Sequence, residues 1–525
     1  MVQGTHRWTV TFEDIVQADV LLLVGTNITE TNPITGLKVK EAVKKHGATL
    51  LTIEAIQPAV GTISNISNLS QQHFCVAPSQ FGAVVLGLLK AVAENNHIDS
   101  AIGQRAPDYV SAVSQAVQQL AWDDLVLSTG ISRESFAHMA ASVAGGRRVV
   151  ALAGQLLLRS QGGYGMCLNL LDLLLLTGKL TARGCGFAPL AEENNDQGAV
   201  EMGAVAELLP GALDLADQDA RTHIARAWKE DLPLAAGATL IEMIDRAQAG
   251  TIKSLFVVGE NPVGSLPPQT GVKEALGKLD LLVCQELFLT ETAALAHVVL
   301  PAASAMEKAG TFTNTEGHVQ AVRPAIDPVG DSRPDWEILS AFSVFLGVPL
   351  EYGEAKEILK EIRAAISGYG SLGPSPIPPA ADPATVDRYV NEGYRRDLAA
   401  RYTLPARAVQ QAGTVQLGLV QSLFHSGKLS TYSNGLLQIE PSGSLQMNPL
   451  DAARCAIVTG DRVHLSNSRG ECTTTAKVLD RVPEGLAWLP DHFAQDALKL
   501  FDCVVDPDTK VPSYRTASVS VVKTT

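Results

Sequence analysis

The sequence has few cysteines, and no two of them are close together. Its 525 residues include seven, namely Cys75, Cys167, Cys185, Cys284, Cys455, Cys472 and Cys503, and no CxxC pair occurs. An odd number of scattered cysteines argues against a disulfide framework and predicts a reducing compartment. Iron–sulfur clusters and structural zinc sites usually take two or more ligands from one tight turn. We therefore expect no iron–sulfur ligands in this chain.

The sequence also lacks an excess of basic residues and a long apolar run. Its 41 Lys and Arg against 55 Asp and Glu give a net charge of −14, which argues against nucleic-acid binding. The most apolar stretch, residues 168–176, carries Asp172 and is far shorter than the ~20 residues of a spanning helix. The first eight residues contain no apolar targeting segment. We expect a cytoplasmic protein that reaches the inner face of the membrane only through a complex.

Apolar runs alternate with helical patterns along most of the chain. The helical spacing of residues 36–46 lies between two such runs, as in a strand–helix–strand unit. The five runs of this kind are residues 19–25, 48–54, 148–154, 254–259 and 279–285. Strands that are apolar on both faces are typical of parallel sheets covered by helices. The sequence therefore predicts an α/β fold with two doubly wound parallel-sheet domains.

The pattern of residue types changes in the last third of the chain. Residues 368–384 are rich in Gly and Pro, and short β-prone runs follow beyond residue 415. We place four parts in order: a first α/β domain at 1–146, a second at 147–345, a helical segment with a linker at 346–410, and a mainly β barrel at 411–525.

Two of the apolar runs end in nearly the same phrase. Gly25-Thr26-Asn27 follows the first run, and Gly259-Glu260-Asn261-Pro262 follows the fourth. Glycine allows close backbone approach and an amide can bind a ligand at the carboxyl end of a buried strand. Each phrase also suits a plain turn, so a ligand-binding role and a purely structural role both remain open here.

A longer phrase resembles the molybdopterin oxidoreductase family. Residues 296–317 read AHVVLPAASAMEKAGTFTNTEG, and agreeing phrases occur in family order at 194–203, 259–262 and 448–463. This resemblance covers almost the whole chain. It implies two α/β domains around a bis-molybdopterin guanine dinucleotide, capped by a β-barrel. Whether this chain binds that cofactor or has lost it stays open.

The resemblance also implies candidate cofactor-binding residues. Glu54 stands where relatives often show Asp-Pro-Arg and can accept hydrogen bonds from a guanine edge, but Ala55 and Ile56 follow it. Gln155 and Gln285 follow buried strands, where a structural amide is the competing interpretation. The full set of candidates is Gly25, Asn27, Glu54, Gln155, Asn195, Gln197, Gly198, Gly259, Asn261, Pro262, Gln285 and Ser426. We assign no catalytic residue and no metal ligand.

Two branches of the family are most similar. Residues 424–431, FHSGKLST, look like the large iron–sulfur subunit of NADH–quinone oxidoreductase, whereas residues 197–203 are shared with formate dehydrogenase catalytic subunits. Members normally begin with a cysteine-rich cluster segment and a metal-ligating position, and we expect this chain to lack both. The leading hypothesis is a structural and docking body within an NADH–quinone oxidoreductase, next to an iron–sulfur partner. The alternatives are a formate-dehydrogenase-like molybdenum or tungsten core completed by another chain, and a scaffold whose cofactor cleft has closed.

Overall fold

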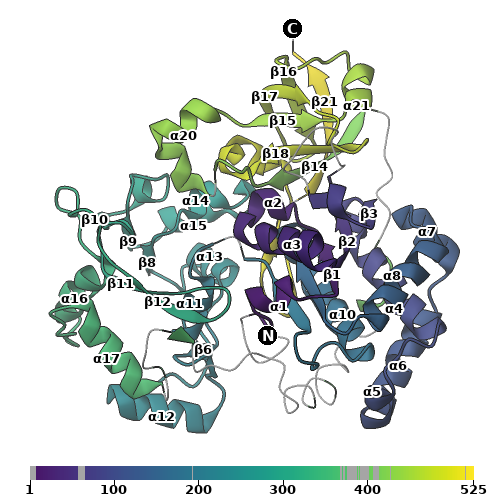
Figure 1. Cartoon of the computed structure of the whole chain (residues 1–525). Helices are drawn as coiled ribbons and strands as arrows, with labels where there is room; N and C mark the ends of the chain where they lie inside the picture. Colours follow the sequence, from purple (N-terminus) through teal and green to yellow (C-terminus); the bar gives the residue numbers. More distant parts are fainter. Residues whose placement is uncertain are drawn as a thin grey trace. The chain divides into compact units, whose positions relative to one another are not determined.

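The computed structural model divides the chain into two units. Its described residues are 8–56, 66–191, 193–366, 369, 373–374, 387, 390, 401–405, 413–425, 427–514 and 516–524. The first unit consists of Met1–Glu192 and Pro379–Thr525, and the second consists of Glu193–Pro378 (Figure 1). The first unit is thus built from two separate stretches of chain, with the second unit inserted between them in sequence.

A five-stranded parallel sheet lies in the first unit. Its order is β3-β2-β1-β4-β5, so β1 is central and the chain moves outward on one side before it crosses to the other. The strands are β1 (Val20–Val24), β2 (Thr49–Glu54), β3 (Gln72–Cys75), β4 (Val149–Ala153) and β5 (Gly186–Pro189). The predicted boundary at residue 146 is wrong, because β4 pairs with β1 in the same sheet. The second unit begins instead at Glu193.

Helices cover both faces of this sheet, and every residue of β1 is buried as a result. Val20, Leu22 and Val24 belong to the core that contains α4, α8 and α10, whereas Leu21 and Leu23 pack with α1 and α3. The helices of this part are α1 (Phe12–Val16), α2 (Ile28–Thr31), α3 (Pro33–His46), α4 (Phe81–Glu94), α5 (Ser100–Arg105), α6 (Pro107–Gln118), α7 (Trp122–Thr129), α8 (Arg133–Gly145), α9 (Gln155–Leu158) and α10 (Gly163–Leu176).

The C-terminal stretch of the first unit forms a closed six-stranded barrel, which confirms the predicted β domain. Its order is β14-β18-β15-β17-β16-β21. The strands are β14 (Thr414–Val420), β15 (Ser444–Met447), β16 (Arg462–Asn467), β17 (Gly470–Val478), β18 (Leu486–Pro490) and β21 (Thr516–Lys523), with short helices α20 (Asn434–Ile439) and α21 (Pro449–Arg454) and a two-stranded pair of β19 (Val504–Val505) and β20 (Pro512–Ser513). Alternate side chains of each strand fill its interior.

The second unit contains a smaller parallel sheet of order β10-β9-β8. Its strands are β8 (Ser254–Val258), β9 (Leu281–Glu286) and β10 (Val298–Pro301). The other elements are β6 (Leu208–Leu209), β7 (Leu213–Asp214), β11 (Gly310–Thr313), β12 (His318–Val322), β13 (Gly373–Pro374), α11 (Asp196–Glu201), α12 (Gln218–Trp228), α13 (Leu240–Gln248), α14 (Pro262–Ser265), α15 (Val272–Gly277), α16 (Asp335–Phe345) and α17 (Ala355–Ala365). The expected α/β class with parallel sheets and a C-terminal barrel is confirmed.

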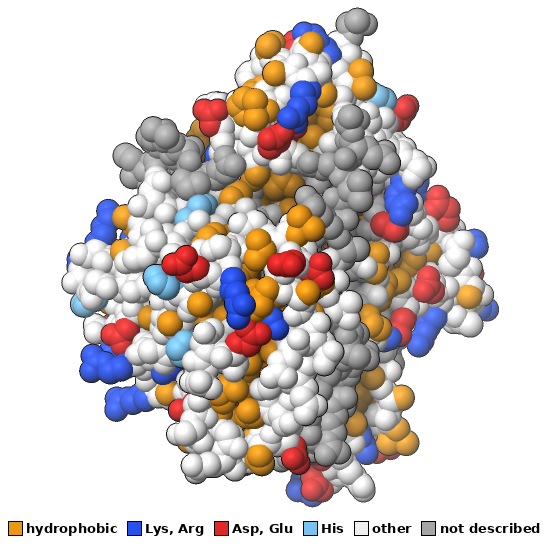
Figure 2. Space-filling view, turned by 90° about the vertical axis from the view of Figure 1, so that its right-hand side faces the viewer, with side chains coloured by type: hydrophobic (Ala, Val, Ile, Leu, Met, Phe, Trp, Pro, Cys, Tyr) orange, Lys and Arg blue, Asp and Glu red, His pale blue; other side chains and the backbone are white. Residues whose placement is uncertain are grey.

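Two further observations concern the surface charge and the helices. On the face shown in Figure 2, Lys and Arg side chains are interspersed with Asp and Glu, and no broad basic patch gathers there. Among the described residues, no helix has both the length and the apolar character needed to cross a membrane.

Candidate functional site

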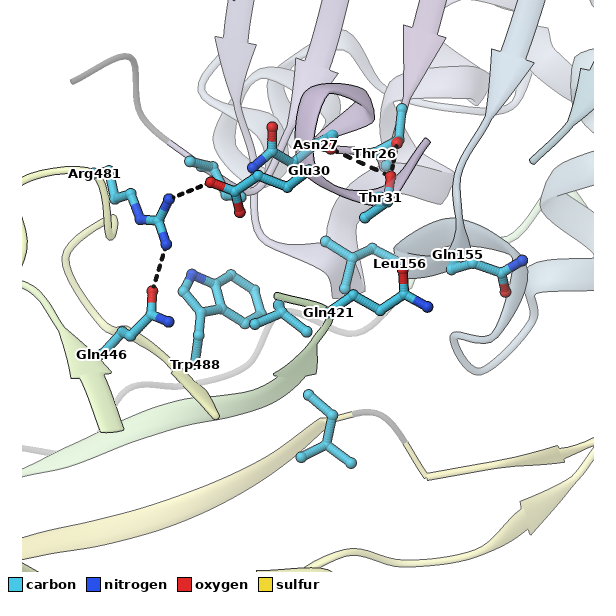
Figure 3. Close-up of a pocket in the computed structure, with 14 residues that line it drawn as sticks. Thr26, Asn27, Glu30, Thr31, Gln155, Leu156, Gln421, Gln446, Arg481 and Trp488 are labelled. Carbon is cyan, nitrogen blue, oxygen red and sulfur yellow. Dashed lines mark hydrogen bonds and ion pairs between the residues drawn. The ribbon is translucent and has the colours of Figure 1, made fainter. Parts of the chain in front are cut away.

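The candidate site lies where the five-stranded sheet reverses its winding. Strands β1 and β4 are neighbours, but the chain leaves them toward opposite sides of the sheet. Open α/β sheets bind ligands in the crevice at this switch point, beyond the carboxyl ends of the strands. A pocket that opens to solvent is found there (Figure 3). Its lining comes from the turns after β1 and β4 and from the barrel, namely Gly25, Thr26, Asn27, Glu30, Thr31, Ile56, Gln155, Leu156, Leu419, Val420, Gln421, Gln446, Arg481 and Trp488.

Two glycines bring the turns after β1 and β4 together. Gly25 has a φ of 69°, and a Cβ at this position would lie 2.8 Å from the Leu157 Cβ. A Cβ on Gly154 would lie 2.2 Å from the Cβ of Thr26. Neither position accepts a larger residue without moving backbone. Gly25 therefore acts through chain packing at the edge of the pocket.

Two buried polar atoms at the pocket have no partner within the described part of the chain. The Asn27 side chain is 8% exposed and its Oδ1 accepts no hydrogen bond, although Asn27 is the N-cap of α2. The Trp488 indole is 2% exposed and its Nε1–H donates none. Buried polar groups are normally satisfied, so one open acceptor and one open donor in the same pocket indicate space for a polar ligand.

The charged groups of the pocket neutralise each other. Glu30 and Arg481 are the two ionic side chains in its lining, and Arg481 Nη1 lies 2.7 Å from Glu30 Oε1. Arg481 Nη2 also donates to Gln446 Oε1 at 3.0 Å. Figure 3 shows the guanidinium between these two partners, which come from α2 and from β15. Among the described residues that line the pocket, Arg481 is the cation, and it is paired with the Glu30 carboxylate.

Glu54 lies at the carboxyl end of β2 and is 1% exposed. Ser67 Oγ donates to its Oε2 at 3.3 Å, whereas Oε1 has no partner among the described residues. Burial raises the pKa of Glu54 to about 8. The side chain is therefore mostly a neutral acid at pH 7, and it is not part of the pocket lining.

The matching phrase in the second unit is organised differently. Asn261 is the N-cap of α14, and its Oδ1 accepts from Thr292 Oγ1 at 2.8 Å and from two backbone N–H groups. Its Nδ2 donates to Glu291 Oε2 at 2.7 Å. Pro262 occupies the first position of α14, and Gly259 has a φ of 62° in the turn after β8. The oxygen and the nitrogen of the Asn261 amide are thus both hydrogen-bonded within the second unit, whereas Asn27 Oδ1 has no partner among the described residues.

Two of the three residues expected to approach a pterin in the second unit also form hydrogen bonds within that unit. Asn195 has a φ of 69°, and its Oδ1 accepts from the Thr313 backbone N–H at 2.8 Å. A Cβ on Gly198 would lie 2.1 Å from that Oδ1. Gln197 Nε2 donates to the fully buried Glu201 at 2.9 Å. This network joins α11 to β11, and the assignment of Asn195, Gln197 and Gly198 to a pterin stays a prediction.

The two candidate glutamines differ in location and in the hydrogen bonds of their side-chain amides. Gln155 lines the pocket and its Nε2 donates to the Leu190 carbonyl at 2.6 Å. Gln285, at the end of β9, donates to Asp335 Oδ1 at 2.7 Å, and its Oε1 has no partner among the described residues. Ser426 lies outside the described residues. The structure therefore brings Gly25, Asn27 and Gln155 together at one pocket and places the other described candidates elsewhere.

Sequence reasoning missed the barrel side of the pocket. Arg481, Gln446 and Trp488 reach it from β15, β18 and the turn before β18, hundreds of residues from Asn27. Glu30 carried a weak signal, since it follows Asn27 by one helical turn and so shares its side of α2.

The unpartnered atoms test whether a pterin dinucleotide suits these residues. At the pocket, Asn27 Oδ1 is an acceptor and Trp488 Nε1–H is a donor. Pterin and guanine edges carry adjacent N–H and C=O groups that complement such a set. The residues of the first unit therefore fit the heterocyclic parts of the cofactor, and Arg481 is the cation that would face its phosphates.

The first unit thus combines a parallel sheet that has a pocket at its switch point with a C-terminal barrel that contributes to the lining. The chain belongs to the molybdopterin oxidoreductase family, because the model "Molybdopterin oxidoreductase" matches residues 2–344. A second model, "Molydopterin dinucleotide binding domain", matches residues 418–518, which contain the barrel. The suspected family is confirmed, and the second match supports a molybdopterin cofactor.

The chain is similar to several curated proteins with different activities. It is 27% identical to "F420-dependent formate dehydrogenase subunit alpha" of Methanocaldococcus jannaschii, over 99% of this chain and 78% of that protein. It is 30% identical to "NADPH-Fe(3+) oxidoreductase subunit alpha" of Geobacter sulfurreducens, over 92% of this chain and 54% of the relative. It is 29% identical to a subunit of the NADH-quinone oxidoreductase of Rhizobium meliloti, over 92% of this chain and 53% of the relative. The chain spans about half the length of the latter two.

A solved structure shares the fold. Acetylene hydratase from Pelobacter acetylenicus superposes with a TM-score of 0.73 over 99% of this chain and 80% of that one, at 14% identity.

Proposed function

We propose that this chain is the molybdopterin-family body of the large subunit of a respiratory oxidoreductase of the NADH–quinone type. Its first unit holds a pterin dinucleotide, and its main role is to dock the partner subunits that carry electrons. The similarity to the Rhizobium meliloti protein supports this branch of the family.

The observation that carries the proposal is the placement of the seven cysteines. They are scattered along the sequence without a CxxC pair, whereas iron–sulfur and structural zinc sites usually take two or more ligands from one tight turn. In the described ranges no three His, Cys, Asp or Glu side chains gather as a metal site. Electrons would therefore pass through clusters held by other segments or chains, and a partner with iron–sulfur clusters follows from that.

The test is purification of the chain with and without an iron–sulfur partner. We expect guanine nucleotide to be released on acid denaturation and no dye reduction with NADH or formate by the chain alone. Rapid dye reduction by the isolated chain would contradict the proposal, and so would a chain that carries no nucleotide and binds no partner.

A second candidate is a formate-dehydrogenase-like core whose molybdenum or tungsten ligand comes from elsewhere. Its support is the similarity over 99% of this chain to the Methanocaldococcus jannaschii protein. Elemental analysis separates the two: one Mo or W per chain, with formate-dependent dye reduction after a cluster-bearing partner is added, favours the second candidate.

A further inference from the structure

The Glu30–Arg481 ion pair spans the pocket between distant parts of the first unit. Glu30 is on α2, beside the sheet, and Arg481 is in the turn between β17 and β18 of the barrel. The side chains of Glu30 and Arg481 are 14% and 30% exposed, so the pair is neither fully buried nor freely solvated. The pair lies in the pocket lining, and the guanidinium keeps part of its surface exposed (Figure 3).

Within the part of the chain that the structure describes, some of the N–H donors of Arg481 have no partner. Nη1 donates to Glu30 and Nη2 donates to Gln446, and Gln446 is neutral. A guanidinium has five N–H donors and binds carboxylates and phosphates in the same planar geometry. The pyrophosphate bridge of a dinucleotide carries two negative charges against one on a carboxylate, so it can compete for the position that Glu30 holds. The unpartnered Asn27 Oδ1 and Trp488 Nε1 lie in the same lining and offer a polar ligand further contacts.

We propose that Arg481 binds a phosphate group of the ligand in this pocket and that Glu30 is an internal placeholder, displaced when the phosphate arrives. This inference rests on the proposed function, because it assigns residues to the nucleotide held by the first unit. Ligand binding would then exchange one ion pair for another. Glu30 would lower affinity for phosphate and fix the barrel turn in the ligand-free state.

The experiment is calorimetric titration of the full chain, stripped of bound nucleotide, with guanosine diphosphate. Glu30→Gln frees the guanidinium, so we expect binding about two- to fivefold tighter than for the unsubstituted chain, the range that a partly exposed ion pair supports. Arg481→Gln should weaken binding at least tenfold. Arg454→Gln is the matched control, since Arg454 pairs with Asp451 and Glu484 in the same barrel outside the pocket lining, and should leave binding unchanged.

A charge swap separates phosphate binding from a purely structural pair. The double variant Glu30→Arg with Arg481→Glu keeps an ion pair, so its urea midpoint should recover most of what Arg481→Gln loses, while binding of guanosine diphosphate stays weak. Recovery of binding in the swap, or normal binding by Arg481→Gln, would overturn the inference and leave the proposed function standing. An unsubstituted chain that releases no guanine nucleotide and binds neither guanosine diphosphate nor an iron–sulfur partner would overturn both.

Discussion

At the scale of single residues, Glu54 is a carboxyl group that burial keeps protonated. Its pKa rises from an ordinary value of 4.5 to about 8, chiefly through desolvation. Between these two values the folded chain binds one more proton than the unfolded chain. The free energy of unfolding therefore falls as the pH rises from about 4.5 to about 8, and this contribution is fully present only below 4.5.

Glu54→Gln should flatten this part of the stability profile, because an amide of the same shape does not titrate. Urea midpoints at pH 5, 6, 7 and 8 measure it. Glu41→Gln is the control, since Glu41 pairs with Lys45 on the surface and its lowered pKa puts its effect below this range. Equal slopes in Glu54→Gln and the unsubstituted chain would show that Glu54 ionises normally.

Single positions also show what the sequence could predict of the site. The turns holding Asn27 and Asn261 were predicted because both follow strongly apolar runs. The difference in hydrogen bonding between the two side chains was not predicted. Glu291 and Thr292, which hydrogen-bond with Asn261, lie 30 and 31 residues further along the chain. Hydrogen-bond partners of this kind depend on tertiary packing, which leaves no local pattern.

At the scale of elements, helix α10 carries a buried ion pair in an otherwise apolar stretch. Asp172 is fully buried and accepts from Tyr109 at 2.8 Å, from Tyr402 at 2.7 Å and from Arg401. Asn169 also accepts from the same guanidinium. These bonds fasten residues 401–402, which precede the barrel, to the helix layer of the five-stranded sheet.

Asp172→Asn should destabilise the chain by about 3–5 kcal/mol, because it leaves the Arg401 charge buried without its partner. Urea unfolding measures this. Asp387→Asn removes an exposed ion pair with Arg105 and should cost less than about 1 kcal/mol. Similar costs for the two variants would mean that the Asp172 network is well solvated.

The position of the Trp488 indole depends on a glycine in the neighbouring strand. Gly418 of β14 is its register partner, and a Cβ there would lie 2.2 Å from the indole. Gly418→Ala should cost about 1–3 kcal/mol and shift the tryptophan emission as the ring moves in the pocket. Gly435→Ala meets no atom within 4 Å and should change neither property. An unchanged spectrum in Gly418→Ala would show that the ring has room to spare.

The strands themselves were readily predicted, because residues buried on both faces form continuous apolar runs. Their grouping into sheets was not, since the run at 148–154 has the same pattern whether it begins a new sheet or joins β1. Pairing between strands separated by more than a hundred residues is decided by packing of α4, α8 and α10, which periodicity does not report.

At the scale of the whole molecule, the seven thiols share one property. Since burial raises the pKa of all of them, few are thiolates at neutral pH. The native chain at pH 7.5 should react with a disulfide reagent at least tenfold more slowly than free cysteine, and all seven thiols should react after denaturation in guanidinium. A single fast thiol in the native chain would contradict this and would mark a candidate metal ligand.

The division of the first unit into two stretches has a consequence for synthesis on the ribosome. The second unit is one continuous stretch and can complete its contacts as soon as it has emerged. The first unit cannot, because Glu30 must wait for Arg481, and Asp172 for Arg401, until the polypeptide is nearly finished. We therefore expect the first unit to reach its full stability only after the barrel has been synthesised.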